Sequence, residues 1–250
     1  MRSPAKKPIG SKWVFKTKTN PDGSIRHKAR LVIKGYMQSD WGGTYAPVGK
    51  LTTFRYLASL AAGYEFAIDH MDVVTAFLNP HVDDPELCME IPKGWGSGNG
   101  SAGIRGNGGG GNIRGNGGAG NIRGNGGAGN IRAGTIIRLN KALYGLKQAP
   151  RLWYKDIDTF LQSLSFTQLR ADSNLYIYRE GTTLVLLLLY VDDISMAYPS
   201  KAAAVVKNIK AKLADKYRIT SLGAARQFLG IEITGDIAED TNRRTISLGQ

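Results

Sequence analysis

The stretch with the clearest capacity for chemistry is LVLLLLYVDDISM, at residues 184–196. Eight apolar or aromatic residues run directly into Asp192 and Asp193, and apolar residues resume after them. Burying two adjacent carboxylates beside such a run is costly unless something compensates both charges. A hard divalent cation with oxygen ligands is the simplest compensation. The sequence therefore predicts a metal-binding carboxylate turn at the end of a buried strand.

A second doublet, Asp83-Asp84, provides an internal comparison. It lies in NPHVDDPEL, between prolines and polar residues, where both charges can be hydrated. That doublet needs no compensating ligand, so only the pair at 192–193 is a candidate site.

A third carboxylate, Asp72, lies in FAIDHMDVVTAF at residues 66–77. A short β-prone stretch ends near Asp72 and passes into TAFL, which can open a helical turn. A strand-end aspartate is often no more than a helix cap. If the strand lies beside the turn at 192–193, however, three carboxylates come together. With two magnesium ions and a basic wall, they would form a phosphoryl- or nucleotidyl-transfer centre.

The elements that must position these carboxylates alternate between strands and helices. The apolar run at 184–190 has strand length, and residues 191–193 suit the tight turn of a hairpin. Helical periodicity follows Pro150 and recurs at 201–217. The expected order is a strand with Asp72, a helix, the strand at 184–190, the carboxylate turn, the strand at 194–198, the helix at 201–217 and a strand at 226–233. This order predicts an α+β fold with a ferredoxin-like βαββαβ layer.

An N-terminal β-hairpin is expected at residues 12–35, with its turn at Asn20-Pro21-Asp22-Gly23. In the returning strand, four cations have the same parity and should share one face of the hairpin: Arg26, Lys28, Arg30 and Lys34. This face is either an ordinary solvated surface or a wall that contacts phosphates.

The formal net charge of +13 over 250 residues favours a polyanionic partner. Nucleic acid is the usual one, although an anionic membrane surface would respond to the same field. The apolar runs are too short for a membrane span or a signal peptide, which favours an intracellular protein without a membrane partner. A single cysteine, Cys88, excludes an internal disulfide, and the three histidines lack zinc-ligand spacing.

One tract, at residues 96–134, departs from this organisation. It consists almost entirely of Gly, Asn, Ile, Arg and Ala and repeats with a nine-residue period, as in NIRGNGGAG. Glycine at this density cannot offset its ordering entropy by burial, so a disordered loop is expected. The tract has no acidic residue, which excludes a calcium-binding β-roll. Its arginines leave RNA contact open as an alternative to a passive insertion.

Taken together, these stretches resemble the reverse transcriptase domain of copia-type LTR retrotransposon polyproteins. The matching segments are KWVFKTKTNPDGSIRHKARLVIKG, YAPV, FRYLASLAA, MDVVTAFLN, KALYGLKQAPRLWY, YVDD and LGAARQFLGIEI. The resemblance implies one reverse transcriptase domain over residues 1–250, shaped as a polymerase right hand. The βαββαβ layer would be the palm and the N-terminal hairpin part of the fingers. Thumb and connection would be incomplete, and RNase H would lie beyond the chain.

The resemblance also implies roles for particular residues. Asp72 and Asp192 would bridge two Mg²⁺ ions (Mn²⁺ being possible), Asp193 would be the third acidic residue, and the Val73 carbonyl would be a further ligand. Phe77 would exclude a ribose 2′-OH, and Lys28 and Arg30 would grip the incoming triphosphate. The remaining nucleotide-binding residues implied by the resemblance are Tyr144, Gly145, Gln148 and Tyr190.

Two hypotheses of different classes follow. The first is an RNA-directed DNA polymerase that takes RNA or DNA template-primer and deoxynucleoside triphosphates, in a cytoplasmic virus-like particle. The second is an inactive retroelement relic that keeps the fold and nucleic-acid binding. Intact Asp72, Asp192, Asp193 and Phe77 favour the first, and the glycine-rich insertion favours the second. A nucleotide cyclase on the same topology gives KALYGLKQAPR no role. The oligomeric state is not predicted.

Overall fold

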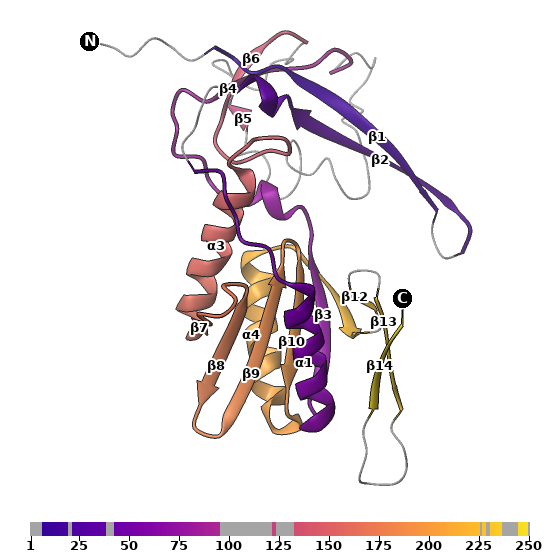
Figure 1. Cartoon of the computed structure of the whole chain (residues 1–250). Coiled ribbons are helices and arrows are strands. Elements are labelled where there is room, and N and C mark those ends of the chain that lie inside the picture. Colours follow the sequence, from indigo (N-terminus) through magenta and orange to yellow (C-terminus); the bar gives the residue numbers. More distant parts are fainter. Residues whose placement is uncertain are drawn as a thin grey trace. The chain divides into compact units, whose positions relative to one another are not determined.

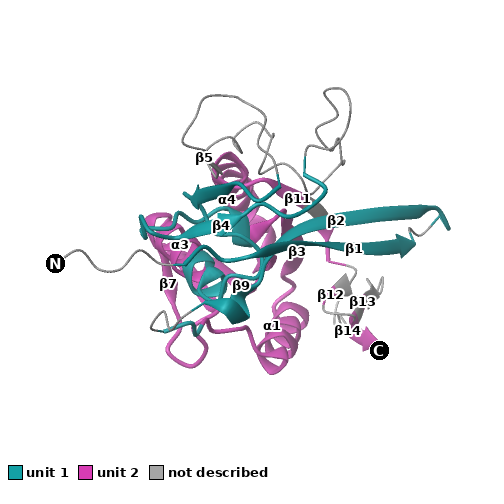
Figure 2. Cartoon of the chain, turned by 90° about the horizontal axis from the view of Figure 1, so that it is seen from above, with its two compact units in different colours: residues 1–45, 77–153 teal, residues 46–76, 154–250 magenta. Residues whose placement is uncertain are grey.

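The chain divides into two compact units. In the computed structural model, unit 1 comprises residues 1–45 and 77–153, and unit 2 comprises residues 46–76 and 154–250 (Figure 2). The structure describes residues 7–19, 22–38, 43–95, 122–123, 133–225, 227–228, 231–236 and 245–249. Most of the tract at 96–134 lies outside these residues, so the prediction that it is disordered stays a prediction. The described helices include none that is long and apolar enough to cross a bilayer.

Unit 2 is built on a six-stranded sheet in which every pair of neighbours is antiparallel (Figure 1). The strand order is β11-β3-β10-β9-β8-β7. The strands are β3 (Ala67–Val73), β7 (Phe166–Gln168), β8 (Leu175–Glu180), β9 (Thr183–Tyr190), β10 (Asp193–Tyr198) and β11 (Ile219–Ala224). The apolar run of the sequence is therefore β9, which lies inside the sheet as expected.

Along the chain, β3, helix α3 (Ala149–Ser163), β9, β10, helix α4 (Ala203–Lys216) and β11 follow the expected alternation of strands and helices. The expected last strand of this sheet was wrong. Residues 219–224 pair with β3, whereas the described residues of the expected strand at 226–233 pair in another sheet. Because β11 is an edge strand, one side of its backbone needs no partner and its sequence ITSLGA needs no apolar run.

Three further strands of unit 2 form a separate sheet, in the order β12-β13-β14. Its strands are β12 (Gln227–Phe228), β13 (Ile231–Asp236) and β14 (Thr245–Gly249). Phe228 is 1% exposed and stacks on Phe54 with ring centroids 4.2 Å apart. This contact ties the small sheet to helix α1 (Leu51–Gly63).

Helices cover both faces of the six-stranded sheet. In Figure 1, α1 lies in front of the strands and α4 behind them. Alternate residues of β9 accordingly pack in opposite directions, and Leu186 and Leu188 join Phe54 of α1 in one core cluster. On the opposite face, Asp69 of β3 accepts hydrogen bonds from Lys210 of α4 and from Tyr198. Burial on both faces explains why β9 is apolar without alternation.

Unit 1 contains the expected hairpin, formed by β1 (Ser11–Thr19) and β2 (Ile25–Ile33). A three-stranded sheet in the order β4-β6-β5 lies in the same unit, with strands β4 (Cys88–Glu90), β5 (Ile122–Arg123) and β6 (Ile136–Leu139). Its core gathers buried residues from both sheets, among them Leu31, Ile33, Met89 and Leu139. Three short 3₁₀ helices complete the described elements of the chain: η1 (Gly35–Met37), η2 (Ala76–Leu78) and η4 (Ser200–Ala202).

The start of α1 is capped by a carboxylate that is distant in sequence. Lys50 precedes the helix, and a lysine side chain has no acceptor for the exposed backbone amides. Asp172 takes this role, accepting hydrogen bonds from the Thr53 hydroxyl (2.5 Å) and the Lys50 amide (3.4 Å). Burial would raise the pKa of Asp172, but these bonds and the bond from the Asn174 amide outweigh it and hold the pKa below its usual value.

We expect the Asp172→Asn substitution to lower the free energy of unfolding by about 1–2 kcal/mol near neutral pH, because the helix loses a charged cap. A lowered folded-state pKa stabilises the fold above the ordinary carboxyl pKa of about 3.9, and this contribution is lost as the pH falls through the folded value. Denaturant unfolding followed by far-UV circular dichroism at about pH 7 and below about pH 4 should show a gap between the two proteins that closes at the lower pH. A gap independent of pH would contradict this account.

Candidate catalytic centre and nucleotide-contacting cluster

The carboxylate doublet lies at a two-residue hairpin turn, as the sequence predicts. Tyr190 and Asp193 form the last cross-strand pair of β9 and β10, so Val191 and Asp192 are the two turn residues. Val191 has a φ of 57°, a left-handed conformation that usually requires glycine at this position of a hairpin turn. A β-branched residue there stores backbone strain, on the order of 1–3 kcal/mol. The turn that carries Asp192 therefore has, at Val191, a backbone conformation that the local sequence does not favour.

Strand pairing brings Asp72 to this turn. In the register of β3 with β10, Asp72 lies directly opposite Asp193, although they are far apart in the sequence. The Val73 amide also donates a hydrogen bond of 2.7 Å to the Asp192 carbonyl, which joins the end of β3 to the turn itself. The three aspartates that the sequence singles out thus lie at one end of adjacent strands.

Asp193 has a partner that was not predicted from the sequence. Its Oδ1 lies 2.9 Å from Nε2 of His70, which precedes Asp72 by two residues on the same face of β3. The histidines lack zinc-ligand spacing, but a histidine in HMD, beside a candidate carboxylate, was a usable signal of another kind. Phe228 was also missed, and its ring lies against both His70 and Tyr190.

The predicted metal ligands Asp72, Val73 and Asp192 lie at this end of the sheet. Carboxylate and carbonyl oxygens are the ligands that magnesium prefers in proteins. Among the residues that the structure describes, no three His, Cys, Asp or Glu side chains are grouped closely enough to hold a metal ion. The ligand set of Asp72, Val73, Asp192 and Asp193 therefore stays a prediction.

In unit 1, three residues expected to contact the nucleotide come together. The Arg30 guanidinium lies 5.4 Å from the centroid of the Tyr144 ring, a cation–π contact. Phe77 meets the same ring edge-on, with centroids 6.0 Å apart. Strand β2, helix η2 and the YGLKQ segment thus contribute to one cluster. Its residues were predicted individually from the sequence, but their contacts with one another were not.

The YGLKQ segment is locked against the end of β2 by backbone contact. Gly145 has a φ of 91°, and a Cβ there would lie 2.1 Å from the Ile33 carbonyl oxygen. The Ile33 amide donates a hydrogen bond of 2.8 Å to the Tyr144 carbonyl. The close backbone approach that a glycine permits in this motif is therefore an approach to β2.

Gln148 is a buried member of the same segment, with 8% of its surface exposed. Its side-chain oxygen accepts a hydrogen bond of 2.9 Å from Gln38, whose own side-chain oxygen accepts one from the Lys147 amide. Gln38 was not anticipated, because no local pattern marks a glutamine that pairs with a residue 110 positions away. This network makes Gln148 a support for the segment.

The cationic face of the hairpin contains cations from both strands. Lys34 directly follows β2, and its amide donates a hydrogen bond of 2.9 Å to the Gly10 carbonyl, so its place on this face stays a prediction. Strand β1 contributes Lys16 opposite Lys28 and Lys18 opposite Arg26. Like charges directly opposite each other destabilise a strand pair, so this face is suited to an anionic ligand.

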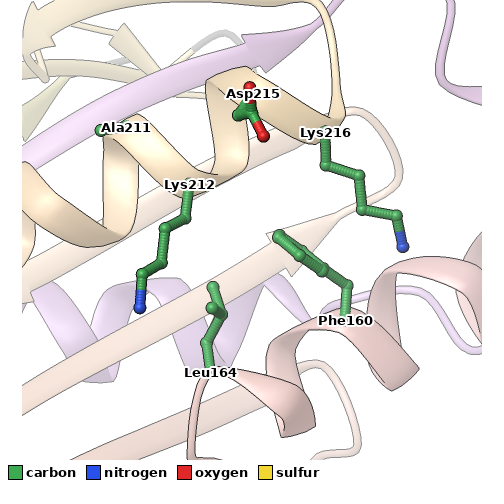
Figure 3. A pocket seen from close by; sticks show the side chains of 6 residues that line it. All are labelled: Phe160, Leu164, Ala211, Lys212, Asp215 and Lys216. Carbon is green, nitrogen blue, oxygen red and sulfur yellow. The ribbon is translucent and has the colours of Figure 1, made fainter.

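Unit 2 also has a surface pocket of about 560 Å³ (Figure 3). Its lining residues come from α3 and the turn that follows it, and from α4: Phe160, Leu164, Ala211, Lys212, Asp215 and Lys216. The Lys216 ammonium lies 4.5 Å from the centroid of the Phe160 ring. Since α4 contacts Asp69 of β3 and side chains alternate along a strand, this pocket lies on the face of the sheet opposite Asp72.

We expect Gly145→Ala to destabilise unit 1 more than Gly23→Ala does. Both glycines have positive φ, at 91° and 80°, but a Cβ at Gly23 meets no described atom within 4 Å, whereas one at Gly145 collides with the backbone of β2. Backbone strain alone should cost about 1–2 kcal/mol at Gly23, and the clash should add to it at Gly145. All four tryptophans fall in unit 1, so denaturant unfolding followed by tryptophan fluorescence measures the difference. Equal losses of stability would contradict the close contact.

Comparison with known proteins agrees with the order of these motifs. The family described as "Reverse transcriptase (RNA-dependent DNA polymerase)" matches residues 2–104 and 124–248. A Pol polyprotein from the Nicotiana tabacum transposon TNT 1-94 is 33% identical over 244 residues, which cover 96% of this chain and 16% of the relative. One from the Arabidopsis thaliana transposon RE2 is 31% identical over 228 residues, covering 90% of this chain and 13% of the relative.

A more distant match is the Gag-Pol polyprotein of the Saccharomyces cerevisiae transposon Ty1-DR4, 27% identical over 238 residues, covering 92% of this chain and 12% of the relative. The chain thus spans less than a fifth of the length of these relatives. Both the family match and the identity to the two plant polyproteins extend over almost the whole chain. The chain therefore belongs to the reverse transcriptase (RNA-dependent DNA polymerase) family, as a reverse transcriptase domain of the copia-type retrotransposon polyproteins that its motifs resemble.

Proposed function

We propose that this chain is an RNA-directed DNA polymerase that transfers deoxynucleotides to a primer 3′-OH under the direction of a template. The observation that carries the proposal is the pairing of β3 with β10, which places Asp72 opposite the Asp192-Asp193 turn. In this proposal the six-stranded sheet of unit 2 is the palm, and the β1–β2 hairpin of unit 1 belongs to the fingers. The remainder of the polyprotein, including an RNase H, would lie outside this chain.

Asp72 and Asp192, with the Val73 carbonyl, would hold two magnesium ions, or manganese ions in their place. When bound, these ions supply activation of the primer hydroxyl and stabilisation of the pyrophosphate that leaves. The protein's own contribution is positioning. The bond from the Val73 amide to the Asp192 carbonyl keeps the turn against β3, and the pleat of β3 directs Asp72 to the face that α1 covers.

The cluster in unit 1 would select and orient the incoming nucleotide. Arg30 and Lys28 are cations that match a triphosphate, and Phe77 is the bulky side chain that would exclude a 2′-OH. The contact of Phe77 with Tyr144 supports this role, because a side chain held by a neighbour keeps the shape of a selective wall. Tyr144 and Gly145 would line the nucleotide site. Gln148 would support both residues through its hydrogen bond with Gln38. Tyr190, in β9 of unit 2, stays a predicted nucleotide contact. The reaction would take place in a cytoplasmic virus-like particle.

Primer extension on poly(rA)/oligo(dT) with magnesium tests the catalytic part of the proposal. We expect Asp192→Asn to lower incorporation at least about 100-fold, since removal of a metal ligand costs several kcal/mol of transition-state stabilisation. The matched control is Asp83→Asn, at an exposed aspartate of the second doublet, which should retain full activity. Absence of incorporation by the unsubstituted protein would contradict polymerase activity and favour a relic that binds nucleic acid only. Incorporation that survives the Asp192→Asn change would contradict the placing of the catalytic centre at Asp192.

Nucleic-acid binding by the hairpin face is tested separately. We expect Lys16→Gln with Lys28→Gln to weaken template-primer binding and to reduce the slope of log K against log salt by about 1 for each phosphate that the variant no longer neutralises. Removal of two opposed like charges should also leave the hairpin no less stable. Fluorescence anisotropy between about 50 and 200 mM salt gives the affinity and the slope. Lys201→Gln with Lys207→Gln, at two exposed lysines of unit 2, is the control pair, and equal effects of the two pairs would refute the assignment.

A further inference from the structure

The side chain of His70 reaches diagonally from β3 to Asp193 on the neighbouring strand β10. His70 lies directly opposite Ser195 in the β3–β10 register, and Asp193 is two residues away from Ser195 along β10. A diagonal neighbour of this kind is within reach of an aromatic side chain. Nε2 of His70 lies 2.9 Å from Oδ1 of Asp193. An ionised carboxylate only accepts hydrogen bonds, so the Nε2 N–H is the donor.

The ring of His70 bonds to Asp193 and not to Ser195, the polar residue directly opposite it. The Ser195 hydroxyl is buried directly across from His70, yet within the described part of the chain it has no hydrogen-bond partner. The edge of the His70 ring also packs against Phe228, with centroids 5.5 Å apart and planes at 71°. Phe228 in turn stacks on Phe54. Packing therefore fixes the orientation of the ring, and the ring fixes one oxygen of Asp193.

This arrangement separates the roles of the two adjacent aspartates. Asp193 lies directly opposite Asp72, and two like charges in that relation repel each other. The bond to His70 draws an oxygen of Asp193 along β3 toward residue 70. We propose that His70 is a positioning residue of the polymerase centre, which holds Asp193 so that Asp72 and Asp192 are the pair presented to the reaction. This inference rests on the proposed function.

The test compares four variants in steady-state primer extension: His70→Leu, His70→Gln, Asp193→Asn and the double variant His70→Leu with Asp193→Asn. We expect His70→Leu to lower kcat about 10- to 100-fold, as removal of a partner that orients a ligand does, with KM for the nucleotide unchanged. His70→Gln should recover most of kcat, because its amide N–H can reach the same oxygen. In the Asp193→Asn background, His70→Leu should cause no further reduction.

Two results would overturn the inference. In the first, the unsubstituted protein is active and His70→Gln lowers kcat as much as His70→Leu does. The other is a double variant whose reduction in kcat is the product of the two single reductions, which would show that His70 acts independently of Asp193. If His70→Leu does not fold, as judged by thermal unfolding, the histidine resonance described next decides the same question, because that measurement uses only His70→Gln and aspartate-to-asparagine variants.

A spectroscopic measurement tests the hydrogen bond without activity. The chain has three histidines, so ¹⁵N-histidine labelling gives few signals, and the Nε2 resonance of His70 is assigned as the one that disappears in His70→Gln. We expect Asp193→Asn to shift this resonance and Asp83→Asn to leave it in place. No shift in Asp193→Asn would overturn the inference. If the unsubstituted protein incorporates no nucleotide, the proposed function fails and the inference falls with it; if the protein is active and the His70 variants match it, only the inference fails.

Discussion

The antiparallel pairing of β3 with β10 is the interaction on which the candidate catalytic centre depends. A strand places its side chains at fixed intervals on alternating faces, so one register decides every contact across the pair. In the observed register Asp72 faces Asp193 and His70 faces Ser195. A shift by one residue would send the carboxylates of one strand to the opposite face of the sheet. The apolar strand β9 and the helices that cover it make such a shift costly.

Burial of β9 on both faces also accounts for the abrupt change from leucines to aspartates. Leu186 and Leu188 pack with Phe54 of α1, while α4 lies on the opposite face of the sheet (Figure 1). The chain must then reverse within two residues to form β10. The reversal takes place at Val191 and Asp192, and the left-handed backbone conformation of Val191 is strained. Strain of this kind persists only where the surrounding structure imposes it, and it is frequent at functional sites. The carboxylate turn is thus held by the packing of the strands that flank it.

Unit 1 has a comparable dependence on backbone contact. Gly145 and the end of β2 approach so closely that a larger residue at Gly145 would collide with the Ile33 carbonyl, and this contact carries Tyr144 to Arg30 and Phe77. The hairpin beyond it carries opposed cations, whose mutual repulsion an anion between them would relieve. Close packing at one end of the hairpin and concentrated positive charge along it are consistent with a rigid base that presents a phosphate-binding face.

Local patterns in the sequence by themselves determined the N-terminal hairpin, the buried strand at 184–190, the turn at Asp192, the two long helices and the family to which the chain belongs. These features depend on periodicity and turn chemistry within a few residues, which a sequence displays directly. The tertiary structure alone decided that residues 219–224 form the edge strand and that His70 engages Asp193. The edge strand needs no apolar pattern, so no local signal marks it. The HMD stretch places His70 beside a candidate carboxylate, but its bond joins residues 123 positions apart, and no local pattern names that partner.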